Sequence, residues 1–251
     1  MQEKKTAAIV LAAGQGKRMG TKTAKQFLLL GGKPVLYYAL KAFEESCVDY
    51  VVLVTSPDET EYCRREIVEK YRFTKVVALT HGGCERYHSV YHGIRKIEEL
   101  SKEQSFEPEL VFIHDGARPF VDAAMIGQLM EEARIYKACV SATPVKDTIK
   151  IADDAGFCEM TPKRNLVWAV QTPQVFAYDV AALAYDMLIQ REDELLQAGM
   201  QITDDAMVVE TMLQKKVRLV EGSYRNIKLT TPEDLLVAQA FLDDIEKKEK
   251  N

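Results

Sequence analysis

A glycine-rich segment that carries several cations lies near the start of the chain. It reads Leu11-Ala12-Ala13-Gly14-Gln15-Gly16-Lys17-Arg18-Met19-Gly20, and Lys22 and Lys25 follow it closely. Glycines and small side chains let a backbone approach a ligand, and exposed N–H groups can hold anions. Arginine offers a planar fork to phosphate oxygens, whereas lysine offers a mobile point charge. The segment is therefore either a triphosphate-binding loop or a solvated basic loop on the surface.

Two familiar phosphate-binding motifs do not fit this segment. A dinucleotide fingerprint requires a third glycine where Met19 stands, and it requires an acid after the second strand, where Val54-Thr55-Ser56 stand instead. A P-loop requires a Gly-Lys-Ser/Thr ending that is absent here. A nicotinamide-dependent oxidoreductase on a Rossmann fold therefore remains only a remote alternative.

Short apolar runs alternate with helical patterns along the first half of the chain. The sequence predicts strands at Ala7–Ala12, Tyr50–Thr55, Val76–Leu79, Leu110–His114 and Ala138–Ala142. It predicts helices at Pro34–Glu45, Glu59–Tyr71, Ser89–Leu100 and Ala123–Lys137. Continuous apolar strands that alternate with helices indicate an α/β fold with a single Rossmann-like, mostly parallel sheet flanked by helices.

The pattern changes after Pro144. Short alternating segments around the turn Asp153-Asp154-Ala155-Gly156 predict a β-hairpin arm over residues 144–168 that protrudes from the sheet. Further helices are expected at Tyr178–Ala198 and Ala206–Gln214, strands at Val217–Glu221 and Asn226–Leu229, and a last helix from Thr231-Pro232. No repeat or linker is evident, so residues 1–251 are expected to form one domain.

Composition excludes several classes of function. The 251 residues carry a net charge of -5, which argues against a nucleic-acid-binding surface. The five cysteines are odd in number and form no C-x-x-C pair, which favours a reducing compartment such as the cytoplasm. The apolar run Thr6–Ala13 is too short to span a bilayer, so no membrane association is expected.

Later segments share a pattern with one known family. They are Gly82-Gly83-Cys84-Glu85-Arg86-Tyr87-His88-Ser89-Val90, His114-Asp115-Gly116-Ala117-Arg118-Pro119-Phe120, Gln171-Thr172-Pro173-Gln174, Ile202-Thr203-Asp204-Asp205 and Asn226-Ile227-Lys228-Leu229-Thr230. With the glycine segment and Lys25-Gln26-Phe27, this ordered set resembles the nucleotidyltransferases that make nucleoside-diphosphate sugars and alcohols. More narrowly, it resembles the 2-C-methyl-D-erythritol 4-phosphate cytidylyltransferases, over nearly the whole chain.

The resemblance implies an activity and a set of site residues. The activity is transfer of CMP from CTP to 2-C-methyl-D-erythritol 4-phosphate, with Mg²⁺ as cofactor, in the non-mevalonate route to isoprenoid precursors. Ribitol-5-phosphate is the alternative acceptor, although Ala12-Ala13-Gly14 and His-Asp-Gly-Ala-Arg-Pro differ from that family's pattern. The implied catalytic residues are Arg18, Lys25, Arg164 and Lys228. Those expected to bind the nucleotide are Ala12, Ala13, Gly14, Gly16, Gly83, Ser89, Asp115 and Gly116. Those expected to bind the polyol phosphate are Thr148, Arg164, Thr203 and Lys228.

Three of these expectations have alternatives or further consequences. Ser89 is as readily explained as the N-cap of its helix as by contact with the base. Direct ligation of Mg²⁺ by the protein is not expected, because the CTP phosphates hold the ion and Asp115 reaches it through water. The arm implies a homodimer in which Arg164 serves the neighbouring subunit's site.

Cys84, His88 and His92 form a C-x-x-x-H-x-x-x-H pattern, which could indicate a metal site. A structural zinc site normally needs four ligands, so zinc is not expected here.

Overall fold

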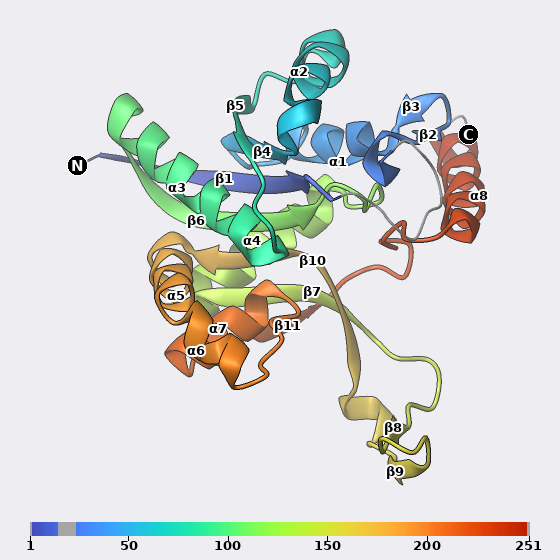
Figure 1. Ribbon diagram of the computed structural model, residues 1–251. Helices are drawn as coiled ribbons and strands as arrows, with labels where there is room; N and C mark the ends of the chain where they lie inside the picture. The colour runs from blue at the N-terminus through green and yellow to red at the C-terminus, as the bar shows by residue number, and fades with distance from the viewer. Residues whose placement is uncertain (1, 15–23, 250–251) are drawn as a thin grey trace.

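A seven-stranded sheet forms the centre of the molecule. The computed structural model describes residues 2–14 and 24–249. The strands follow the order β11-β7-β10-β6-β1-β4-β5 (Figure 1). Their bounds are β1 Glu3–Ala12, β4 Tyr50–Thr55, β5 Val76–His81, β6 Phe106–Asp115, β7 Ala138–Pro144, β10 Trp168–Ala177 and β11 Arg218–Glu221. Of these seven, β10 alone runs antiparallel to its neighbours, which confirms the mostly parallel sheet.

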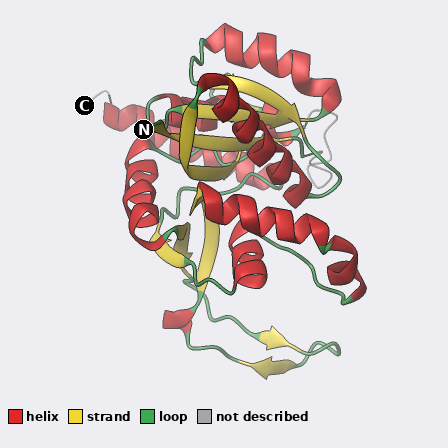
Figure 2. Cartoon of the chain, turned by 90° about the vertical axis from the view of Figure 1, so that its left-hand side faces the viewer, coloured by secondary structure: helices red, strands yellow, loops and turns green. Residues whose placement is uncertain are grey.

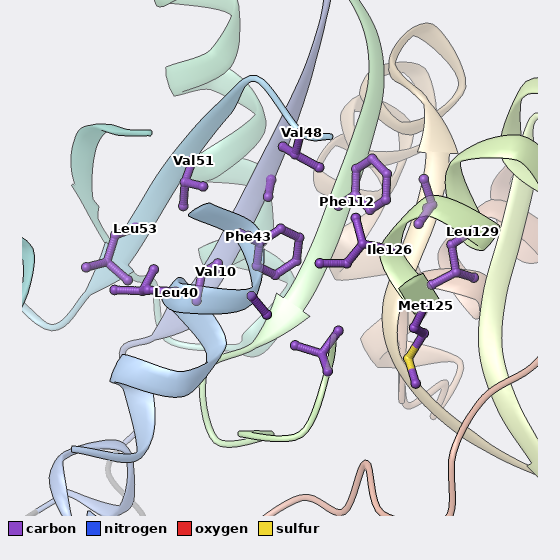
Figure 3. Packing of buried hydrophobic residues seen from close by; sticks show 14 of the residues in the cluster. Val10, Leu40, Phe43, Val48, Val51, Leu53, Phe112, Met125, Ile126 and Leu129 are labelled. Carbon is purple, nitrogen blue, oxygen red and sulfur yellow. The ribbon is translucent and has the colours of Figure 1, made fainter. Parts of the chain in front are cut away.

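Helices cover both faces of the sheet, because side chains alternate along each strand. Ala8 and Val10 of β1 face α1 (Val35–Glu44), η4 (Cys63–Glu69) and α4 (Ala123–Tyr136). Figure 3 shows Phe43 of α1 against Phe112 of β6 in this layer, with ring centroids 6.4 Å apart. Ala7 and Ile9 face the opposite layer, which contains α3 (Arg86–Gln104), α5 (Tyr178–Gln190), α6 (Glu192–Gln197) and α7 (Asp205–Leu213).

A smaller apolar cluster ties the last helix to the beginning of the chain. It joins the β2–β3 hairpin (Leu29–Leu30 and Lys33–Pro34) to α8 (Pro232–Glu249) through Leu30, Val35, Leu229, Ala238 and Leu242. The short helix η2 (Lys25–Phe27) precedes this hairpin directly. The cluster therefore fixes the segment that carries Lys25 against the segment that carries Lys228.

The expected arm is present. It contains the antiparallel strands β8 (Ile151–Ala152) and β9 (Cys158–Met160), joined by a turn in which Gly156 has φ +85°. The short helix η5 (Arg164–Leu166) leads back to β10. Figures 1 and 2 show the arm standing away from the sheet and its helices.

Five details of the sequence-based prediction were wrong. The segment expected as one helix over Tyr178–Ala198 is divided at Arg191 into α5 and α6. Residues 226–229 form no strand, because the Asn226 side chain is buried and its amide bonds to the Thr172 carbonyl. Strand β10 was not expected, since Pro173 interrupts its pattern; the ladder with β7 shifts register there, between Val170 and Gln174. Helix α3 begins at Arg86, and Glu85 rather than Ser89 is its N-cap. The segment expected as one helix over Glu59–Tyr71 is divided into η3 (Pro57–Glu59), α2 (Thr60–Tyr62) and the π-helical η4.

The order of the strands determines where a ligand can bind. The chain moves outward from β1 to β4 and β5, and then returns to place β6 on the other side of β1. In open α/β sheets, ligands bind beyond the carboxyl ends of the strands at such a switch point. Ala13 and Gly14 directly follow β1 and Asp115 ends β6, so these residues border this crevice. Within the described residues, no helix combines the length and the apolar composition needed to cross a bilayer.

Candidate functional site

Two adjoining cavities open at the switch point. The first, called the loop cavity, has a volume of about 510 Å³ and is lined by Leu11, Ala13, Gly14, Lys25, Gln26, Gly83, Cys84, Glu85, Arg86, Ser89, Asp115, Ala117 and Lys228. The second, called the strand cavity, has a volume of about 570 Å³ and lies among β7, β10, β11 and α7. Arg86, Asp115 and Lys228 line both, so the two cavities meet at these charged side chains.

The described part of the glycine segment is fixed by a buried amide. Gln26 is 1% exposed, and its Nε2 donates to the carbonyl oxygens of Ala12 at 2.6 Å and Gly14 at 3.2 Å. Two carbonyls that would otherwise face the interior are thus satisfied by one side chain. The wall of the loop cavity is therefore preformed on this side.

Gly83, with Gly82 packed behind it on Ala13, forms another wall of the loop cavity. A Cβ on Gly82 would lie 2.5 Å from the Ala13 Cβ, and a Cβ on Gly83 would lie 2.3 Å from the His88 Cβ. Only glycine allows this close approach. The Ser89 hydroxyl, 6% exposed, accepts a hydrogen bond from the Gly83 N–H at 3.1 Å. Ser89 therefore shapes the cavity without acting as the helix cap.

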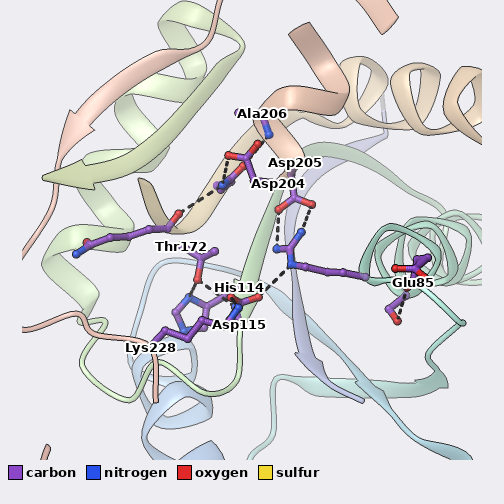
Figure 4. A network of polar contacts seen from close by, with 12 residues as sticks. Glu85, His114, Asp115, Thr172, Asp204, Asp205, Ala206 and Lys228 are labelled. Atoms are coloured by element: carbon purple, nitrogen blue, oxygen red, sulfur yellow. Dashed lines mark hydrogen bonds and ion pairs between the residues drawn. The ribbon is translucent and has the colours of Figure 1, made fainter. Parts of the chain in front are cut away.

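An ion cluster centred on Asp115 joins the two cavities. Its Oδ2 lies 2.7 Å from the Lys228 Nζ and its Oδ1 lies 3.3 Å from the Arg86 Nε (Figure 4). Burial alone would raise the pKa of Asp115, but the charges of Arg86 and Lys228 hold that pKa well below its usual range. The carboxylate is therefore ionised throughout the physiological pH range.

Arg86 connects this cluster to α7. Its guanidinium donates two hydrogen bonds to Asp205, at 2.7 and 2.8 Å, and Asp205 also accepts one from the Tyr185 hydroxyl at 2.5 Å. Burial lowers the pKa of Arg86, but the Asp205 and Asp115 carboxylates outweigh it and raise that pKa well above its ordinary value. Bidentate pairing gives geometric precision as well as energy. Arg86 is therefore a fixed cation in the floor of the site.

A chain of hydrogen bonds fixes the loop after β6. The Asp115 N–H donates to the Thr172 Oγ1 at 3.1 Å, and this hydroxyl lies 3.1 Å from the His114 Nδ1. The His114 Nε2 lies 3.2 Å from the Arg118 carbonyl oxygen. A carbonyl can only accept, so Nε2 carries the proton and Nδ1 accepts from the Thr172 hydroxyl. The imidazole is fully buried, and burial lowers the pKa of His114 to about 4.

The strand cavity is held in shape by another buried amide. The Gln174 Nε2 donates to the Asp204 Oδ2 at 3.0 Å, while its Oε1 accepts from the Ala206 N–H at 2.8 Å. Gln174 thereby attaches the start of α7 to β10. Thr203, at the edge of the cavity, directly precedes the Asp204 N-cap of that helix.

The structure places the expected site residues unevenly. Those that line at least one cavity are Ala13, Gly14, Lys25, Gly83, Ser89, Asp115, Thr203 and Lys228. Ala12 contributes its carbonyl to Gln26, and Gly116 packs behind the site, where a Cβ would lie 2.9 Å from the Leu11 carbonyl oxygen. Thr148 and Arg164 are exposed on the arm and line neither cavity. Gly16 and Arg18 lie outside the described residues.

Several site residues were missed from the sequence. Arg86, Asp205 and Thr172 stand inside the motif segments, and Gln26 stands beside Lys25, but no role was expected for them. Their importance depends on burial and on partners distant in sequence; Arg86 and Asp205, for example, are 119 positions apart. The available signal was a polar or charged side chain within an otherwise apolar or glycine-rich motif.

The histidine pattern on α3 has other partners. The His88 ring lies 3.0 Å from the Glu192 carboxylate, and the His92 Nδ1 lies 2.9 Å from the His81 carbonyl oxygen. In the part of the chain that the structure describes, no three His, Cys, Asp or Glu side chains are grouped as metal ligands would be.

Comparisons with known proteins agree on one family. The family model described as 2-C-methyl-D-erythritol 4-phosphate cytidylyltransferase matches residues 6–244. The protein of that name from Lachnoclostridium phytofermentans is 45% identical over 238 residues, which cover 95% of this chain and 96% of that protein. The one from Caldanaerobacter subterraneus subsp. tengcongensis is 44% identical over 236 residues, which cover 94% and 97%.

Solved structures give the same result. The 4-diphosphocytidyl-2C-methyl-D-erythritol synthase from Anaerococcus prevotii superimposes with a TM-score of 0.76 at 32% identity, over 96% of both chains. The 2-C-methyl-D-erythritol 4-phosphate cytidylyltransferase from Thermus thermophilus does so with a TM-score of 0.67 at 26% identity, over 94% of this chain and 98% of that one.

The buried His114 predicts an acid-dependent loss of stability. Its pKa in the folded chain is about 4, below the ordinary value of 6.5 for histidine. Below pH 6.5 the unfolded chain therefore binds a proton that the folded chain does not bind until about pH 4. The free energy of unfolding should therefore fall by about 3 kcal/mol between pH 7 and pH 4 from this group alone. Urea unfolding of the wild type and of His114→Gln across this range measures the difference, because glutamine can make both hydrogen bonds but does not titrate.

The exposed His92 supplies the control, and His92→Gln should keep the wild-type dependence on pH. Parallel pH profiles for the wild type and His114→Gln would show that the buried imidazole does not act in this way.

Proposed function

Because the chain belongs to the 2-C-methyl-D-erythritol 4-phosphate cytidylyltransferase family, we propose that its two joined cavities bring together CTP and 2-C-methyl-D-erythritol 4-phosphate. The chain is a nucleotidyltransferase, and its products are 4-diphosphocytidyl-2-C-methyl-D-erythritol and pyrophosphate. The observation that carries the assignment of sites is the shared border formed by Arg86, Asp115 and Lys228. The loop cavity would take the nucleotide and the strand cavity the polyol phosphate.

The main chemical difficulty of this reaction is charge. The phosphate of the polyol attacks the α-phosphorus of CTP in line and pyrophosphate leaves, so two anions must meet. No protein nucleophile is required, because the attacking phosphate is already ionised. Lys25 lines the loop cavity and, with Arg18, would neutralise the charge that grows on the α-phosphate and the leaving group.

Lys228 is placed to orient the attacking phosphate. Its ammonium group lies at the junction of the two cavities, 2.7 Å from the Asp115 carboxylate. Asp115 keeps this cation in place, and Arg86 keeps Asp115 in place. Thr203 lines the strand cavity on the side of α7, where it would contact the polyol. Holding the two reactants together accounts for a large part of the acceleration in such reactions.

The donor set suits Mg²⁺ that is held mainly by phosphate. Asp115 is an ionised carboxylate beside the loop cavity, and both of its oxygens already face cations. That arrangement fits contact through water better than direct ligation, and Mg²⁺ commonly keeps several waters in such sites. When bound, the ion would neutralise charge on the phosphates.

The arm supports a homodimer in which each subunit completes its partner's site. Thr148 and Arg164 line neither cavity of their own chain. Large apolar side chains are exposed along the arm, among them Ile151, Phe157 at 73% and Leu166 at 71%. Apolar surface of this kind marks an interaction site. We infer that the arm packs on a second copy and offers Thr148 and Arg164 to the polyol phosphate there.

A cytoplasmic location is part of the proposal. All five cysteines are unpaired, and two of them, Cys63 and Cys139, are buried with the pKa of each thiol raised to about 12 by burial. Unpaired thiols of this kind are typical of proteins in a reducing compartment.

Pyrophosphate release tests the function directly. The purified chain with Mg²⁺ should release pyrophosphate when CTP and 2-C-methyl-D-erythritol 4-phosphate are both present. ATP, GTP or UTP in place of CTP, and ribitol 5-phosphate in place of the acceptor, should give much lower rates. Faster release with ribitol 5-phosphate would assign the chain to that alternative reaction.

Lys25→Ala tests the assigned electrostatic role. Loss of one preorganised cation should lower kcat by about 100-fold to 1000-fold, while the thermal unfolding temperature stays close to that of the wild type. Lys41→Ala is the matched control, because Lys41 lies on the exposed side of α1, away from both cavities. An unchanged kcat in Lys25→Ala would remove Lys25 from the mechanism.

Mixing two inactive variants tests the exchange of arms. Lys25→Ala damages the body and Arg164→Ala damages the arm, so each homodimer should be nearly inactive. A heterodimer would contain one intact site, made from the Lys25 of one chain and the Arg164 of the other. After unfolding and joint refolding in equal amounts, about a quarter of wild-type activity should return, since half of the dimers are mixed. No recovery in a mixture shown to be dimeric would mean that each arm serves its own chain.

A further inference from the structure

The second half of the segment Gly82–Glu85 separates two cavities. Cys84 and Glu85 line the loop cavity on one side. On the other side they line a third cavity of about 500 Å³, which is completed by α3, α5, α6 and residues 200–202. Gly82 and Gly83 pack closely on Ala13 and His88, but Cys84 and Glu85 have open space on both sides. The position of Cys84 and Glu85 therefore depends largely on hydrogen bonds.

Three hydrogen bonds from N–H groups hold the segment. The Gly82 N–H donates to the Thr55 carbonyl oxygen at 2.8 Å, and the Gly83 N–H donates to the Ser89 hydroxyl at 3.1 Å. The Glu85 N–H donates to the His88 Nδ1 at 3.1 Å. The Glu85 carboxylate in turn accepts from the His88 N–H, which completes a capping box at the start of α3. Gly82 directly follows β5, so the start of the segment is held by the sheet, whereas its end, at Glu85, is held by His88.

The His88 ring is itself fixed from a different element. Its Nδ1 accepts from Glu85, so the neutral ring carries its proton on Nε2, which lies 3.0 Å from the Glu192 Oε1. Glu192 is the first residue of α6 and also accepts from the Tyr87 hydroxyl at 2.6 Å. The Tyr87 hydrogen bond leads the contributions that lower the pKa of Glu192, with burial opposing them, so this carboxylate is ionised.

We propose that His88, oriented by Glu192, is a positioning residue that sets how the segment Gly82–Glu85 meets the nucleotide base. This inference rests on the proposed binding of CTP in the loop cavity. The His88 side chain also meets the segment at Gly83, where an added Cβ would lie 2.3 Å from the His88 Cβ and 3.2 Å from its Cγ. His88 lines the third cavity, whereas Lys25 and Lys228 line the loop cavity. The base contact expected for Ser89 puts this segment at the base end of the nucleotide, and the phosphates are assigned to Lys25 and Lys228. Its effect should therefore be on the binding of CTP rather than on the chemical step.

His88→Ala separates these two effects. The KM for CTP should rise about fivefold, as expected for the loss of one hydrogen bond, while kcat stays within about twofold of the wild type. The preference for CTP over UTP should fall by a similar factor, and the KM for the polyol phosphate should not change. His88→Gln should restore the wild-type KM, because glutamine at this position of a capping box can accept from the same N–H. Glu192→Ala should raise the KM for CTP in the same direction but by less.

A matched control distinguishes positioning from general loosening of the helices. Asp186 on α5 pairs with Arg95 on α3, so Asp186→Asn weakens contact between α3 and another helix of the same layer without touching the segment. This variant should keep the wild-type KM for CTP. Thermal unfolding of every variant shows whether it folds, and Glu192→Ala leaves the capping box intact should His88→Ala not fold.

The outcomes distinguish this inference from the function on which it rests. A wild-type chain that releases pyrophosphate, with an unchanged KM for CTP in both His88→Ala and Glu192→Ala, would overturn the positioning role alone. An equal rise of KM in Asp186→Asn would also overturn it. A wild-type chain that releases no pyrophosphate from CTP would overturn the proposed function.

Discussion

Asp115 is the charge on which the arrangement of the site depends. It is 7% exposed at the end of β6, and it stays ionised there because Arg86 and Lys228 lie within 3.3 Å and 2.7 Å. An unpaired carboxylate at such a depth would be protonated or would destabilise the fold. Arg86 is also paired with Asp205, whereas Asp115 is the carboxylate that pairs with Lys228. Removing both cations would leave the Asp115 charge buried and uncompensated.

The same cluster links parts of the chain that are far apart in sequence. Asp115 belongs to the central sheet, Arg86 to the first turn of α3, and Lys228 to the segment that leads to α8. Arg86 also binds Asp205, which brings in the start of α7. Each of these elements contributes to the wall of a cavity. Their relative positions are therefore set by electrostatic contacts in the same place where two anionic substrates would meet.

Buried amides and hydroxyls provide the remaining rigidity. Gln26 holds the strand end before the glycine segment, Gln174 attaches α7 to β10, and Thr172 connects Asp115 to His114. Each of these side chains makes a hydrogen bond to a backbone N–H or carbonyl group that would otherwise need a water molecule as its partner. A protein with an overall charge of -5 can in this way present a local group of cations with fixed geometry. Preorganisation of this kind is what stabilisation of a charged transition state requires.

The sequence by itself determined the class of fold, the family and much of the candidate site. Apolar runs with helical intervals are enough to indicate a mostly parallel sheet, since burial on both faces demands them. The ordered motifs identified the family, because each lies in one continuous segment. The hairpin arm was visible for the same reason, as its turn and its alternating residues are local.

Only the tertiary structure decided which residues act together. Strand β10 was missed because Pro173 and the polar residues around it contradict a local strand pattern, and neighbouring strands impose the extended conformation. The roles of Arg86 and Asp205 were invisible because their pairing spans 119 residues. Local patterns reflect backbone preference and burial, whereas ion pairs and shared cavities arise only when distant segments meet in space.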